Sequence, residues 1–190
     1  SFNAALIAET WEELRETPES PLLNRVTQGL AQPGTSLQPF LLAAGWQIGL
    51  ADAPSEPITA PSTFNGMAIS CRRTPQESTW SAVLSAGCPG PFTTIAREMG
   101  DTEFLASMRR WGFLDAPPLT LPTVAADLAE ASLVMQTEAL GQGQLLIAPL
   151  QMVQAMATIG NDGNRPTLHI LAEALPGCVE PTANPNAVVS

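Results

Sequence analysis

The clearest amphipathic pattern in the first half of the chain lies in residues 33–50. Apolar residues recur there at steps of three and four, the spacing of one helix face, at Leu37, Leu41, Ala44 and Ile48. Thr35 and Ser36 precede the pattern, and hydroxyl side chains favour helix starts because they accept hydrogen bonds from free backbone N–H groups. The pattern therefore predicts a helix over residues 35–49, with one of these two hydroxyls as its cap.

A second pattern of this kind covers residues 148–163, where Pro149 suits the first turn of a helix. Its apolar residues form one stripe with neighbours beside it: Met152, Met156 and Ile159, then Leu150, Val153 and Ala157. A methionine-rich stripe at helical spacing usually belongs to a core. We therefore expect a helix over 149–160 that buries this face and packs near the 35–49 helix.

Shorter apolar patterns predict further helices over residues 21–30, 77–87, 91–100 and 101–113, and in part of 123–136. Thr10 and Glu13 have the spacing of a capping box, which predicts a short helix starting there. Residues 51–75 are rich in Pro, Ser and Thr, which favours extended chain with at most a short hairpin. The sequence thus predicts a mainly α domain over residues 1–172, followed by a Pro- and Asn-rich tail over 173–190.

The composition limits the classes of function. With 190 residues, 45% of them hydrophobic, the chain can bury a sizeable core. Its net charge of −10 repels phosphate backbones and argues against binding of nucleic acid. No apolar run approaches the roughly 20 residues of a membrane span, and the acidic first residues do not resemble a signal peptide. Any export signal or anchor is therefore expected outside this chain.

The basic residues exclude one kind of chemistry. All eight are arginine, and the chain contains neither lysine nor tyrosine. Arginine stays protonated in proteins and cannot act as a base. A base active near neutral pH would have to be His169, or a carboxyl group with a raised pKa. His169 lies in a segment that looks like a strand, and we interpret it as structural.

The three cysteines, Cys71, Cys88 and Cys178, show no metal-binding spacing, and one histidine cannot complete a zinc site with them. We therefore predict no metal and no cofactor. Three cysteines allow at most one internal disulfide, and the spacing does not say which pair would form it. Cys88, close to a helix start, is either a thiol nucleophile or a buried residue, and we favour burial.

Three phrases, in order along the chain, carry a resemblance to a known family. They are "ETWEELRETPESPLLNRVTQGLAQPG" before the 35–49 helix, "GCPGPFTTIAREMG" over residues 87–100, and "LGQGQLLIAPLQMVQAMATIGNDG" over residues 140–163. Together they resemble the transpeptidase domain of penicillin-binding proteins, most like class B, over about residues 1–170. The resemblance implies the helical lobe of a penicillin-binding-protein and β-lactamase-like fold, with little or no central sheet.

That family uses three motifs, Ser-x-x-Lys, Ser-x-Asn and Lys-Thr-Gly, and this chain departs from all of them. The resemblance places Thr35 at the nucleophile and Gln38 at the lysine of the first motif. It places Gly87 and Pro89 at the ends of the second motif, and the third cannot occur without lysine. An amide cannot hold a proton at neutral pH, so these positions predict a vestigial site with no catalytic residues.

The resemblance implies a catalytically inactive domain with a structural or protein-interaction role in the cell envelope. Envelope or cell-division proteins are the expected partners, outside the cytoplasm, with anchoring by a segment outside this chain. Two alternatives stay open: a module that still binds peptidoglycan peptides or β-lactam-like ligands, and a fragment of a serine-type D,D-transpeptidase. For ligand binding the candidates are Thr35, Ser36, Gly141, Gln142 and Gly143, and the glycine turn is expected beside the start of the 35–49 helix.

Overall fold

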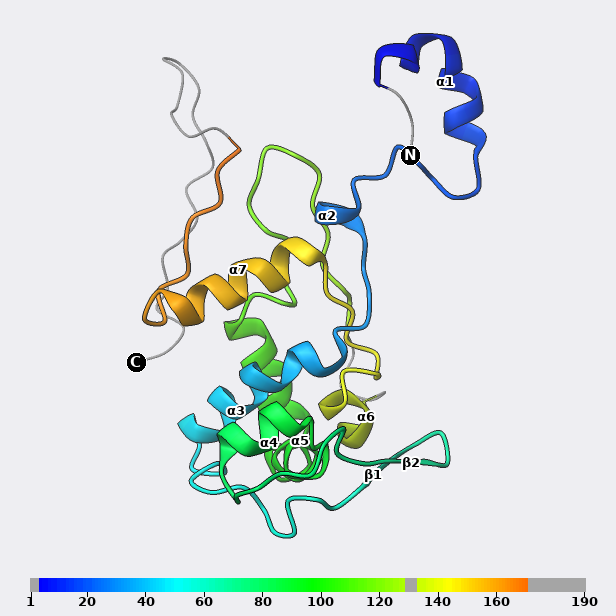
Figure 1. The fold of residues 1–190 in the computed structure, drawn as a ribbon. Coiled ribbons are helices and arrows are strands. Elements are labelled where there is room, and N and C mark those ends of the chain that lie inside the picture. Colours follow the sequence, from blue (N-terminus) through cyan, green and yellow to red (C-terminus); the bar gives the residue numbers. More distant parts are fainter. Residues whose placement is uncertain (1–3, 129–132, 171–190) are drawn as a thin grey trace.

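A computed structural model describes residues 4–128 and 133–170 (Figure 1). Its elements in chain order are η1 Ala4–Leu6, α1 Ile7–Glu16, α2 Arg25–Gln28, η2 Gly34–Leu37, α3 Gln38–Gln47, β1 Ser62–Phe64, β2 Met67–Ile69, α4 Trp80–Ala86, α5 Gly90–Arg110, α6 Met135–Ala139 and α7 Pro149–Gly160. The described residues are thus mainly α, with β1 and β2 as their sheet. This confirms the mainly α part of the predicted fold class, while the predicted tail over 173–190 lies outside the described residues.

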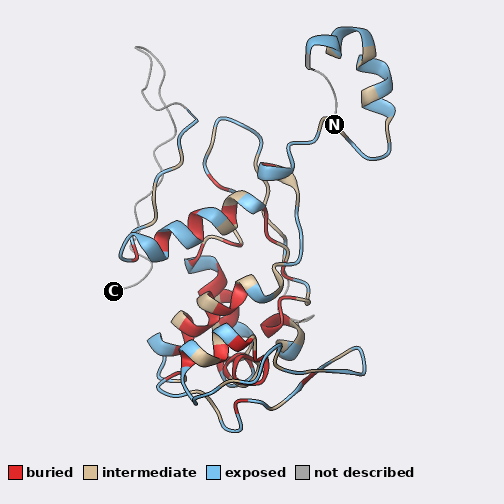
Figure 2. Ribbon diagram, in the orientation of Figure 1, coloured by how far each residue is buried: buried red, intermediate tan, exposed pale blue. Residues whose placement is uncertain are grey.

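The core forms where α3, α4, α5 and α6 meet, and the buried residues concentrate there (Figure 2). Phe40 of α3 is fully buried and contacts the rings of Trp111 and Phe113 edge-on, with ring centroids 5.0 Å apart in each pair. Such edge-on pairs add to the stability gained by burial alone. The fold also buries the large apolar side chains of the 101–113 segment, Phe104, Leu105, Met108, Trp111 and Phe113.

The long helix α5 joins the two helices predicted over 91–100 and 101–113. Gly100 interrupts it with φ 71° and ψ 172°, a backbone conformation that side chains other than glycine rarely adopt. The helix therefore bends at the boundary that the sequence predicted.

The predicted hairpin is present in the 51–75 region. Strands β1 and β2 pair antiparallel, with Ser62 opposite Ile69 and Phe64 opposite Met67. Asn65 and Gly66 join them with positive φ at both positions, which is the geometry of a tight type I′ turn.

The prediction for the buried face of α7 is wrong, although the helix lies where it was expected. Its buried residues are Gln151, Gln154, Ala155 and Thr158. Along the predicted core stripe, by contrast, Met156 is 38% exposed and Ile159 44% exposed, and the neighbouring Val153 is 65% exposed. The reason lies in the partner surface, because three backbone carbonyl groups face the helix and accept hydrogen bonds from the Gln151 amide, at Gly112, Phe113 and Asp115.

Three local expectations also change. Helix α1 begins at Ile7, not at Thr10, because η1 already leads the backbone into it, and the Thr10 hydroxyl instead donates to the Leu6 carbonyl at 3.0 Å. In the 123–136 region, residues 123–128 are not helical, residues 129–132 lie outside the described residues, and a helix starts at Met135. His169 is exposed and lies in a segment without strand structure.

Candidate functional site

The candidate site begins where the chain enters α3. Residues Gly34–Leu37 form a 3-10 turn that leads directly into α3. Neither predicted cap is used, because the Ser36 hydroxyl donates to the Pro33 carbonyl at 2.5 Å and no side-chain cap is present at either helix start. The capping prediction is therefore wrong. Backbone carbonyl groups of the 3-10 turn, in place of a side chain, accept hydrogen bonds from N–H groups at the helix start. Thr35 remains exposed.

Gln38, at the position that the resemblance assigns to the lysine, lies inside the protein. It is only 3% exposed and is the first residue of α3. The Gln38 side chain is therefore packed inside the protein at the helix start, where an ammonium group would lose its hydration. A neutral amide suits this environment better than a charge does.

The turn Gly141–Gly143 lies against the start of the same 3-10 turn, as predicted. The Gly34 N–H donates to the Gly141 carbonyl at 2.9 Å. Gly141 has φ +62°, and a Cβ atom there would lie 2.1 Å from the Gly34 carbonyl oxygen. Glycine is therefore required at position 141 both by its backbone conformation and by the approach of a second backbone.

Two side chains that the sequence did not suggest hold this turn in place. The Gln32 amide donates to the carbonyls of Gln142 and Gly143, at 3.0 and 2.9 Å. From the other side, the buried Glu138 carboxylate accepts from the backbone N–H groups of Gln144 and Leu145, at 2.7 and 3.2 Å. Gln32 and the turn are more than 100 residues apart, so no local pattern could reveal this contact.

The second-motif region contributes a disulfide. Cys71 and Cys88 are bonded, while Cys178 lies outside the described residues. Cys88 is fully buried, so the prediction of burial is confirmed and the thiol-nucleophile alternative is wrong, because a sulfur bonded to another sulfur carries no thiolate. Gly87, just before it, has φ +63° and ends α4.

The structure brings Thr35 and Gly87 to one cavity of about 180 Å³, with Arg72, Arg73, Leu84 and Ser85 as the other lining residues. Gln38 and Pro89 do not line this cavity. One position of the first motif and one of the second therefore face a common space, where the polar side chains are two hydroxyl groups and two arginines.

The described residues contain no group of three side chains suited to hold a metal ion. One titration shift stands out: burial lowers the pKa of the Arg165 guanidinium, and Asp115 partly offsets this. Arg165 lies over Gly112 and donates to the Arg110 carbonyl, so it ties the end of α5 to the segment after α7. Within residues 4–128 and 133–170, no helix has the length and hydropathy to cross a membrane.

Two named proteins are similar in sequence to most of this chain. The chain is 31% identical over 175 residues to the peptidoglycan D,D-transpeptidase PbpA of Mycolicibacterium smegmatis, covering 86% of this chain and 35% of the relative. It is 26% identical over 155 residues to the peptidoglycan D,D-transpeptidase FtsI of Escherichia coli, covering 79% and 26%. The chain thus spans about a third or less of the length of these relatives.

Solved structures show the same fold. Penicillin-binding protein A from M. tuberculosis, as a ceftriaxone acyl-enzyme complex, superposes with a TM-score of 0.70 at 21% identity, covering 87% of this chain and 40% of that one. The D,D-transpeptidase domain from Eggerthella lenta gives 0.71 at 20% identity, covering 86% and 45%. A family model described as the penicillin binding protein transpeptidase domain matches residues 4–190. The chain therefore belongs to the penicillin-binding protein transpeptidase family.

Proposed function

We propose that this chain is a catalytically inactive member of the transpeptidase family, with a structural or protein-interaction role in the cell envelope. The observation that carries the proposal is the first-motif position: the chain has no lysine, and Gln38 is buried where the resemblance places one. A nucleophilic hydroxyl needs a neighbouring base to take its proton. General-base help is typically worth about 10²–10⁴-fold in rate, and Gln38 cannot supply it.

The second-motif region supports the same proposal. Gly87 lacks the hydroxyl that the family uses there, and Cys88 is held in a disulfide. In this region the cavity therefore offers arginines, which stay protonated and cannot relay a proton. Members of a catalytic unit act together, and the loss of any one of them removes most of its effect.

Exposed apolar side chains support an interaction role. Trp46, 54% exposed, and Ile159, 44% exposed, line an apolar cavity of about 610 Å³, whose wall also includes the buried Leu42 and Trp111. Helices α3 and α7 therefore border one cavity. Contiguous exposed apolar surface of this kind often marks a contact site, and an envelope or cell-division protein outside the cytoplasm is the partner class we propose.

The length comparison favours one alternative. Because the chain spans 35% of the M. smegmatis relative, it also fits a fragment of a serine-type D,D-transpeptidase, consisting mainly of the helical lobe and anchored through a segment outside this chain. In that case activity would need residues that this chain does not contain.

Acylation by a β-lactam tests the inactivity. The chain is incubated with a fluorescent penicillin and then weighed by intact mass spectrometry, with an active penicillin-binding protein as the positive control. We expect no adduct on this chain while the control is labelled. A stoichiometric adduct that maps to Thr35 or Ser36 would overturn the proposal.

A further inference from the structure

We infer that two copies of this chain associate by inserting the α1 helix of each copy into the apolar cavity between α3 and α7 of the other. The inference rests on the proposed interaction role and names the partner as a second copy of the chain. It joins two apolar surfaces, one on a helix and one in a cavity, that the rest of the described residues leave open to solvent.

The first surface is the apolar face of α1. None of the residues of α1 is buried, and Figure 1 shows the helix standing clear of α3 to α7. The apolar residues Ile7, Trp11 and Leu14 recur at steps of four and three, the spacing of one helix face, and Trp11 is 45% exposed. A helix of ten residues is only marginally stable in water by itself, so α1 gains stability when this face is covered.

The opposite face of α1 is acidic. The helix carries one base and four acids, namely Arg15 and Glu9, Glu12, Glu13 and Glu16. Helices that lie on membrane surfaces carry Lys and Arg on their polar face, so the charge of α1 argues against a membrane and favours a protein surface.

The charges near the cavity admit an acidic helix. Arg109 is exposed in the last turn of α5, two residues before Trp111 of the cavity wall. No ion pair within the described residues engages Arg109. Asp162 is the acidic residue of the wall, and Arg109 offsets its charge. In a chain of net charge −10, a surface without excess negative charge is a favourable place for α1.

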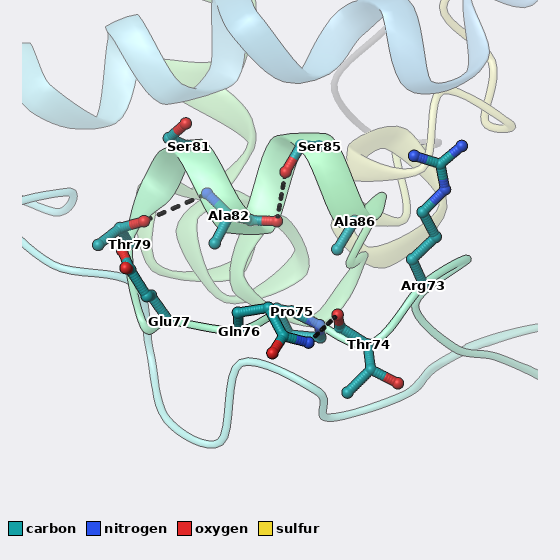
Figure 3. A pocket seen from close by; sticks show the side chains of 10 residues that line it. All are labelled: Arg73, Thr74, Pro75, Gln76, Glu77, Thr79, Ser81, Ala82, Ser85 and Ala86. Carbon is teal, nitrogen blue, oxygen red and sulfur yellow. Dashed lines mark hydrogen bonds between the residues drawn. The ribbon is translucent and has the colours of Figure 1, made fainter.

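The second surface is the cavity of about 610 Å³ to which Trp46 and Ile159 contribute exposed apolar side chains. Its volume is in the range that takes a drug-sized group, which leaves room for an indole ring. A second cavity, of about 280 Å³ beside α4, is chemically unsuitable. Figure 3 shows that amide, carboxylate and hydroxyl side chains line it, among them Gln76, Glu77 and Ser81. An apolar helix face therefore matches the cavity between α3 and α7.

The helix α1 is held away from the cavity of its own chain. Ala31 pairs with Ile147 just before α7 begins at Pro149, which fixes the chain that follows α1 beside the N-terminal end of α7. Ile159 of the cavity wall lies near the other end of α7, about 15 Å further along the helix axis. The α1 of a second copy can reach the cavity without crossing this distance.

The area that such a contact buries favours a reciprocal exchange. A helix of ten residues is about 15 Å long and about 12 Å wide with its side chains, so burying half of its surface removes about 300 Å² from water. The cavity loses a similar area, which gives about 600 Å² for one contact and about 1,200 Å² for two. Stable interfaces begin at about 1,200 Å², so a two-fold pair with both helices inserted reaches this size and a one-way contact does not.

Sedimentation velocity of the whole chain over a wide range of concentrations tests the association. We expect an equilibrium between monomer and dimer. Trp11→Ala and Trp46→Ala should each weaken dimerisation roughly tenfold or more, as aromatic residues at the centre of an interface do. Met67→Ala is the matched control, because it removes a side chain that is 64% exposed from the hairpin, and should leave dimerisation within about twofold. A monomer at every concentration, or equal weakening by all three variants, would overturn the proposal.

Photo-cross-linking identifies what covers α1, and it leaves both tryptophans in place. The change Leu14→p-benzoylphenylalanine puts a cross-linker on the apolar face, and ¹⁵N-labelled and unlabelled chains of this variant are mixed in equal amounts. We expect cross-linked peptides of mixed isotope that join position 14 to residues 39–46 or 159–163. Peptides of a single isotope only would place α1 on its own chain. Cross-links to lipid after addition of phosphatidylglycerol vesicles would place α1 on a membrane, and either result would refute the exchange.

The outcomes separate the exchange from the proposed inactivity. A penicillin adduct on Thr35 would overturn the inactivity and leave the association of two copies standing. A chain that stays monomeric would overturn the exchange of α1 and leave the inactivity standing.

Discussion

Replacing Gly141 by alanine tests the contact that assembles the candidate site. The left-handed backbone at this position costs a side chain about 1–2 kcal/mol. The new Cβ would also lie 2.1 Å from the Gly34 oxygen and 2.5 Å from its nitrogen, so the two backbones must separate. That separation breaks the Gly34 to Gly141 hydrogen bond, worth about 1 kcal/mol. We expect a total loss of about 2–4 kcal/mol in the free energy of unfolding.

Gly49→Ala is the matched control. Gly49 has a similar φ of +74°, but a Cβ atom there meets nothing within 4 Å, so this variant pays only the backbone cost of about 1–2 kcal/mol. Urea unfolding followed by circular dichroism measures both variants against the unmodified chain. If Gly141→Ala and Gly49→Ala lose equal stability, the backbone at Gly141 does not contact Gly34 closely, and the described contact between the glycine turn and the start of the 3-10 turn is wrong.

Three further variants test the buried polar groups and the disulfide. Gln38→Lys should lower the free energy of unfolding by about 2–4 kcal/mol at pH 7, because burial lowers the pKa of the new amine. The unfolded state then binds more protons than the folded state, so this loss of stability should shrink as the pH rises towards about 10. Removing the Cys71–Cys88 bond by substitution of both residues with serine should cost about 3 kcal/mol, as expected for a closed loop of this size, and an unchanged urea midpoint would contradict the bond. Gln151→Leu should cost about 2–4 kcal/mol by leaving three backbone carbonyls without their donor, whereas the exposed Val153→Ala should stay within about 0.5 kcal/mol.

Local patterns predicted the elements of this protein well. The helices α3, α5 and α7, the 62–69 hairpin and the break at Gly100 lie where apolar spacing and turn residues indicated. These features depend on interactions between residues a few positions apart, so a short window of sequence contains the information. The capping predictions at Thr10 and Thr35–Ser36 failed because 3-10 turns precede both helices, and hydroxyl spacing alone does not distinguish a helix start from its interior.

The amino-acid sequence by itself determined which chemistry is missing. The chain contains no lysine, so it cannot supply the lysine side chains of the family's first and third motifs. The absence of a residue type holds for every fold, so this inference needed no structure. The family could also be inferred from the sequence, because three segments that resemble it follow one another in the family's order.

Only the tertiary structure decided which surfaces meet. It buried the polar face of α7 because backbone carbonyls at Gly112, Phe113 and Asp115 require donors that an apolar stripe lacks. It paired Cys71 with Cys88 and set Glu138 behind the glycine turn. Each of these contacts joins groups that are distant in sequence and become neighbours only when the core forms. Because their stabilisation comes from packing and hydrogen bonding across the fold, the local sequence pattern cannot predict them.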